Sequence, residues 1–65
     1  MMYYYVSFKD KMGKERYGIW RYAENPDRAV YLADVFFSLG HPTRYNPDYT
    51  AVVERETDKA ASISF

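Results

Sequence analysis

The side chains that could perform acid–base or nucleophilic chemistry are few in this 65-residue sequence, which has one histidine and no cysteine. The histidine, His41, stands between Gly40 and Pro42, a context typical of a helix-terminal or loop histidine rather than of a general base. The lack of cysteine excludes disulfides and thiolate metal sites. No nucleophile stands at a recognised spacing from a base. We therefore expect no catalytic residue and no enzymatic activity.

Glu54, Glu56 and Asp58 form the one acidic cluster that could hold a hard cation through carboxylate oxygens. In a strand, however, Glu54 and Glu56 would share one face, and this spacing is typical of solvated surface charge. The sequence also lacks a glycine-rich phosphate loop. We expect neither a metal nor a cofactor.

Aromatic residues make up 20% of the chain, and three of them are consecutive in the opening stretch "MMYYYVSFKD". Alternation predicts a strand over residues 2–9, because its even positions are all apolar and would face a core. These inward positions are Met2, Tyr4, Val6 and Phe8. Since neighbours on a strand point to opposite faces, Tyr3 and Tyr5 should then face outward.

The sequence "DKMG" predicts a turn from Asp10 to Gly13, closing a hairpin over residues 2–22. With Asp10 opposite Lys14, the regular register puts Trp20 opposite Tyr4, inside the core. A two-residue turn at Met12 and Gly13 would shift the register by one and turn Trp20 outward beside Tyr5. That turn needs a positive φ at Met12, which is unfavourable, so the sequence favours Trp20 inside.

A helix is predicted over residues 26–39, with Asn25 as its N-cap, Pro26 at its first position and Gly40 as its stop. The apolar stripe that would cover the sheet comprises Ala29, Leu32, Ala33, Phe36, Phe37 and Leu39, with Val30 at its edge. A loop over 40–48 and a strand over 49–57 follow. The alternating end of the chain predicts a terminal strand over 60–65, a frayed tail being the alternative.

These elements predict an α+β fold in one small domain spanning residues 1–65. The expected sheet has three to four strands in the order 2-1-3-4, with one helix packed on one face. The opposite face of the sheet would stay uncovered.

That uncovered face is the candidate binding site, an aromatic surface with a basic fringe. Its predicted residues are Tyr3, Tyr5, Lys9, Tyr17, Ile19 and Arg21. The favoured interpretation is a protein–protein interface, because tyrosine and arginine often carry interface energy. Stacking of single-stranded nucleic acid is the alternative, and a purely structural half-exposed face is the third.

Charge is unevenly distributed although the net formal charge is zero. Residues 1–22 carry five basic and two acidic residues, a net charge of +3, and residues 23–65 carry four basic and seven acidic residues, a net charge of −3. Zero net charge counts against nucleic acid, and the basic hairpin keeps that alternative open. The asymmetry could also guide a second copy into a homodimer. With no apolar run or signal-peptide pattern, we expect no membrane partner and a cytoplasmic location.

In size and element order the chain is similar to small phage-encoded anti-defence proteins, the anti-CRISPR proteins among them. This resemblance implies a compact inhibitor that occupies the surface of a larger nucleic-acid-processing complex. The hairpin followed by "NPDRAVYLAD" also resembles the strand-and-helix core of small DNA-binding domains at integrase N-termini. Those domains place three strands before the helix and are strongly basic. Neither resemblance implies any site residue.

Overall fold

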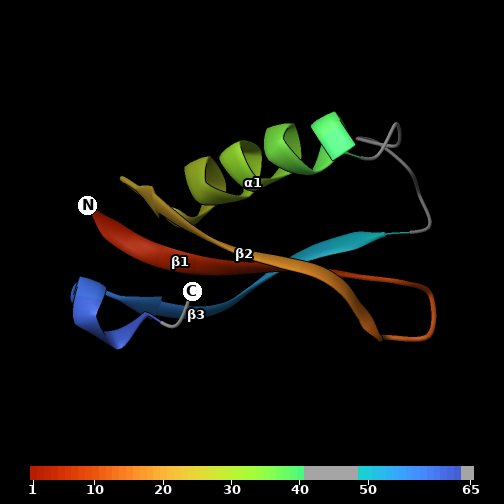
Figure 1. Cartoon of the computed structure of the whole chain (residues 1–65), viewed down its shortest axis with the longest axis horizontal. Helices are drawn as coiled ribbons and strands as arrows, with labels where there is room; N and C mark the ends of the chain where they lie inside the picture. The colour runs from red at the N-terminus through yellow and green to blue at the C-terminus, as the bar shows by residue number, and fades with distance from the viewer. Residues whose placement is uncertain (41–48, 64–65) are drawn as a thin grey trace.

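The computed structural model describes residues 1–40 and 49–63, which form a small antiparallel sheet with one helix on one face (Figure 1). Three strands pair in the order β2-β1-β3, so the first strand is central. The elements are β1 (Met2–Lys9), β2 (Glu15–Ala23), α1 (Pro26–Gly40), β3 (Thr50–Thr57) and the 3-10 helix η1 (Ala60–Ser62). The predicted α+β class and the placement of the third strand beside the first are confirmed.

The core lies between β1 and α1, where the alternation of β1 meets the small residues of the helix. Tyr4, Val6 and Phe8 are at most 4% exposed, and Ala29 and Ala33 are fully buried against them. Two alanines one helical turn apart present little bulk, which allows the helix to lie close to the sheet. The prediction that the even positions of β1 face inward is confirmed.

The hairpin turn forms as predicted, but the register of the two strands beyond it differs from the predicted register. The Asp10 amide donates to the Lys14 carbonyl at 2.9 Å, and Gly13 has a φ of +80°. The register then shifts between Phe8, which pairs with Tyr17, and Lys9, which pairs with Glu15, so that β2 carries one extra residue at this point.

This β-bulge overturns the prediction that Trp20 lies inside. An extra residue in one strand reverses the facing of every residue beyond it. Tyr4 therefore opposes Arg21, and Trp20 opposes Tyr5. The predicted turn was correct, but the predicted position of Trp20 was wrong. The turn itself leaves the register unshifted, and the bulge that follows it shifts the register by one residue.

A second irregularity occurs where β1 pairs with β3. Val6 opposes Val53, whereas Tyr5 opposes Arg55, so Glu54 is the extra residue. Glu56 consequently opposes Tyr4 on the helix side of the sheet, not the outward side that simple alternation predicts. Tyr49, Ala51 and Val53 pack against the core as predicted.

The helix begins as its sequence predicts. The side-chain oxygen of Asn25 accepts a hydrogen bond from the Arg28 amide at 2.8 Å, the geometry of an N-cap. Within the predicted stripe, Val30 and Leu32 pack at the edge of the core, and Phe36 is 50% exposed. The side chains of residues 37–40 lie outside the described part.

The predicted terminal strand over 60–65 is wrong at its beginning, because Ala60–Ser62 form the 3-10 helix η1. Residues 64–65, and the loop residues 41–48 with His41, lie outside the described residues. Within the ranges 1–40 and 49–63, no helix has the length and apolarity needed to span a membrane.

Candidate binding interface

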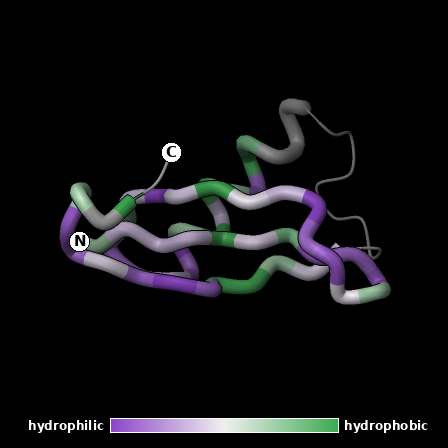
Figure 2. Tube along the Cα trace, turned by 60° about the horizontal axis from the view of Figure 1, so that its bottom comes forward, coloured by the Kyte–Doolittle hydropathy of each residue, from purple (hydrophilic) through white to green (hydrophobic). Residues whose placement is uncertain are grey.

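The side of the sheet that faces away from α1 carries four aromatic side chains from β1 and β2. Figure 2 brings this side forward, with the helix behind the sheet. Tyr3 pairs with Tyr22 across the strands at a ring-centroid distance of 4.6 Å, and Tyr5 pairs with Trp20 at 5.4 Å. Both pairs are tilted, at 44° and 59°, an arrangement that aromatic rings favour over a flat stack. We call these four residues the outer aromatic face.

The third strand adds a cation to this face. Arg55 opposes Tyr5 in the β1–β3 register, and its guanidinium carbon lies 5.8 Å from the Tyr5 ring centroid. A cation within about 6 Å of a ring centroid interacts favourably with the ring's electron-rich face. Tyr5 therefore lies between Trp20 on one neighbouring strand and Arg55 on the other.

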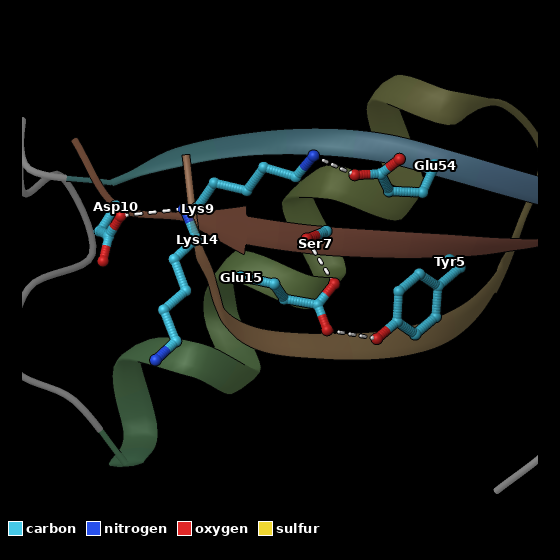
Figure 3. A network of polar contacts seen from close by, with 7 residues as sticks. All are labelled: Tyr5, Ser7, Lys9, Asp10, Lys14, Glu15 and Glu54. Carbon is cyan, nitrogen blue, oxygen red and sulfur yellow. Dashed lines mark hydrogen bonds and ion pairs between the residues drawn. The ribbon is translucent and has the colours of Figure 1, made fainter. Parts of the chain in front are cut away.

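A carboxylate fixes the polar end of Tyr5 (Figure 3). The Tyr5 hydroxyl donates to Glu15 Oε2 at 3.0 Å, and the Ser7 hydroxyl donates to Glu15 Oε1 at 2.6 Å. Burial raises the pKa of Tyr5 above 10.0, and the hydrogen bond and negative charge of Glu15 raise it further. At neutral pH Tyr5 thus remains a protonated donor in a fixed orientation.

This side of the sheet carries charges of both signs. Lys9 pairs with Glu54 across β1 and β3, as Figure 3 shows. Arg55, which opposes Tyr5, adds a cation, and Glu15, which accepts from the Tyr5 hydroxyl, adds an anion. The outer aromatic face is therefore bordered by mixed charge and not by a basic fringe.

The predicted site residues are divided between the two sides of the sheet. Tyr3, Tyr5 and Lys9 lie on the outer side as predicted. Tyr17 and Ile19 pack against the core instead, and Arg21 faces the helix.

The contacts of Tyr17 show that it lies on the helix side of the sheet and not on the predicted outer side. Its ring lies 5.9 Å from that of Phe8, and burial raises its pKa, an effect that the positive charge of Arg21 partly opposes. The β2 bulge is the physical reason for the division, because it reverses the facing of the whole strand from Tyr17 onward.

Sequence reasoning missed Trp20, Tyr22 and Arg55 as members of this surface. The one signal that could have found the first two is cross-strand pairing. The shifted register matches Tyr3 with Tyr22 and Tyr5 with Trp20, and aromatic pairs stabilise antiparallel strands. Arg55 depends on the second bulge, for which the sequence offers no comparable signal.

Among residues 1–40 and 49–63, no group of three or more histidines or carboxylates is placed to hold a metal ion. Glu54 of the acidic cluster pairs with Lys9.

No protein-family model matches the chain, and neither the curated proteins nor the solved structures include a significant match.

Proposed function

We propose that this chain is a non-enzymatic binding protein that attaches to another protein through the outer aromatic face. The observation that carries the proposal is the pair of cross-strand aromatic contacts, Tyr3–Tyr22 and Tyr5–Trp20, on a side of the sheet that α1 does not cover. Tyrosine, tryptophan and arginine are enriched among residues that dominate binding energy.

The rigidity of this face also supports an interface. The ring of Tyr5 is held between Trp20 and Arg55, and its hydroxyl is held by Glu15. A side chain that is already fixed loses little conformational freedom when a partner covers it, which lowers the cost of association. An inhibitor that covers a surface of a larger complex, the role implied by the architectural resemblance, is one form of this function.

Single-stranded nucleic acid is the alternative ligand, because bases stack on exposed aromatic rings. The balance of Lys9 and Arg55 against Glu15 and Glu54 favours a protein instead. Phosphate neutralisation needs a surplus of cations, and these four residues supply two charges of each sign.

The test uses the wild-type protein and a Tyr5→Ala/Trp20→Ala double variant. A partner captured from a lysate by the wild type is purified and titrated against both. We expect the double variant to bind about tenfold more weakly or worse, while circular dichroism shows a folded protein. Tyr31→Ala is the matched control, because Tyr31 is an exposed tyrosine on α1.

Equal affinity of the wild type and the double variant for the captured protein would contradict the proposal. A titration with oligothymidylate in low and in moderate salt tests the alternative, that the face binds single-stranded nucleic acid. Binding that falls steeply with salt and depends on Trp20 would assign the face to nucleic acid.

A further inference from the structure

A second surface lies on the helix side of the sheet, where α1 crosses the edge strand β2. A groove of about 390 Å³ is lined by Arg21 and Tyr22 of β2 and by Leu32, Val35 and Phe36 of α1. Phe36 is 50% exposed, although it belongs to the helical stripe that was expected to cover the sheet. The groove therefore combines apolar walls with one cation.

Arg21 has an environment unlike that of an ordinary surface arginine. Its guanidinium carbon lies 4.7 Å from the centroid of the Phe36 ring, and its Nε is buried without a hydrogen-bond partner. The ion pairs between described residues do not include it. A carboxylate entering the groove would thus meet a cation that is positioned and partly desolvated, conditions that strengthen an ion pair.

The backbone beside the groove is also open. β1 pairs with one edge of β2, and within residues 1–40 and 49–63 no strand pairs with its other edge. Unpaired N–H and C=O groups on an edge strand can pair with an extended chain. Since Arg21 and Tyr22 belong to this strand, a chain added at the edge would pass along the groove.

We propose that the groove and the free edge of β2 bind an extended segment of a partner protein that carries an apolar side chain and a carboxylate two residues apart. Alternate residues of a strand point to one side, so both side chains would enter the groove together. The carboxylate pairs with Arg21, and the apolar side chain covers Phe36 and Leu32. This site shares Tyr22 with the outer aromatic face but no other residue of it, and it does not rest on the function proposed for that face.

Charge complementarity favours such a segment over a second copy of this chain. A second β2 would present its own helix-side residues to the groove, namely Tyr17, Ile19, Arg21 and Ala23. These supply no carboxylate and bring a second cation. A nucleic acid fits poorly as well, because four of the five lining residues are apolar or aromatic and only Arg21 is basic.

The probe is an acetylated, amidated peptide of sequence Thr-Leu-Thr-Glu-Thr-Leu-Thr, which places leucine and glutamate on one face of a strand. Its control has glutamine in place of glutamate. We expect the glutamate peptide to shift backbone amide resonances of β2 and α1, and the glutamine peptide to bind about tenfold more weakly. This comparison leaves the protein unchanged, so it does not depend on the folding of any variant.

Protein variants then assign the effect to Arg21. With Arg21→Gln, the two peptides should bind equally weakly. Arg28→Gln is the matched control and should bind like the wild type, because Arg28 also lies over an aromatic ring, that of Tyr31 at 5.0 Å, but does not line the groove. The Tyr5→Ala/Trp20→Ala variant should also bind the peptide normally, which separates this test from that of the outer aromatic face.

Three results would overturn the proposal. One is failure of the glutamate peptide to bind the wild type better than the glutamine peptide does, which includes the absence of resonance shifts with either at about 1 mM peptide. Another is a dimer, detected by light scattering, that Arg21→Gln abolishes, which would assign the groove to a second copy. The third is displacement of the peptide by oligothymidylate, which would assign it to nucleic acid.

Discussion

Three adjacent tyrosines of identical chemistry have three different environments. Tyr4 is buried under α1 with 4% exposure. Tyr3 contacts Tyr22 on the outer side, and Tyr5 is held by Trp20, Arg55 and Glu15. The difference arises because successive residues of a strand face opposite sides, of which only one is covered by the helix.

Replacing Tyr4 should therefore lower the free energy of unfolding far more than replacing its neighbour Tyr3. We expect Tyr4→Ala to lower the free energy of unfolding by about 3–5 kcal/mol, as for other buried aromatics. Tyr3→Ala, the matched control, should cost about 1 kcal/mol or less. Urea denaturation followed by circular dichroism measures both, and Tyr4→Leu gives a milder change if Tyr4→Ala does not fold. The reverse order of costs would mean that the facing of β1 is inverted.

The raised pKa of Tyr5 predicts a loss of stability at alkaline pH. The folded protein favours the protonated phenol, so this contribution is fully present below pH 10.0, the ordinary pKa, and is lost as pH rises through the raised pKa. The free energy of unfolding of the wild type should thus fall above pH 10.0 more than that of Tyr5→Phe.

Urea unfolding of both proteins at several pH values measures this difference. Glu15→Gln should reduce the fall as well, because it removes the negative charge and the carboxylate acceptor that help raise the pKa. Parallel curves for the wild type and Tyr5→Phe would show that Tyr5 contributes nothing to the pH dependence.

At the scale of the elements, the β2 bulge decides which side of the sheet each residue of that strand faces. The turn at Asp10 to Gly13 alone would set one register, and the bulge converts it to another. The conversion pairs Trp20 with Tyr5 and brings Arg21 beside Phe36. Both proposed binding surfaces therefore depend on this single irregularity.

The single tryptophan of the chain reports on this register. Because Trp20 lies on the uncovered side beside Tyr5, acrylamide should quench its native fluorescence to an extent between those of a buried and a free indole. Tyr5→Ala should increase the quenching by removing the ring that partly covers it, and Tyr31→Ala should not. If acrylamide does not quench the native fluorescence and the emission wavelength is as short as that of a buried indole, Trp20 lies inside the core and the observed register is contradicted.

At the scale of the whole molecule, α1 covers one face of the sheet and does not cover the other (Figure 1). The uncovered side exposes aromatic rings, including that of Tyr22, which is 51% exposed. Exposed aromatic surface is a common basis of association, either with another protein or with a second copy.

Self-association through this face should be weak and concentration-dependent. We expect the mass from light scattering to rise above that of one chain as concentration increases, and the Tyr5→Ala/Trp20→Ala variant to remain at one chain. The Tyr31→Ala variant, altered on the helix, should follow the wild type. A mass of one chain at every concentration would exclude the dimer. It would not bear on the proposed binding of another protein, which the titration of the captured partner tests.

The local signals in the sequence were sufficient for the hairpin, the helix, the third strand and their order, but they predicted a strand where Ala60–Ser62 form a 3-10 helix. Alternation in residues 2–9 determined the buried side of β1, and Asn25 and Pro26 determined where α1 begins. The Asp10–Gly13 turn was determined in the same way. Each of these signals acts between residues close in the chain, so periodicity and turn chemistry are sufficient to identify it.

Only the tertiary structure decided the facing of β2 and the end of β3. Trp20 and Arg21 exchange sides because β2 accommodates one extra residue. In β3 the extra residue is Glu54, and it reverses the facing of Arg55 and Glu56. A bulge is favoured when cross-strand pairs and burial against the helix together outweigh the broken ladder, and that balance involves residues distant in the chain. The sequence alone therefore determined that one side of the sheet is uncovered, and the tertiary structure determined which side chains lie on it.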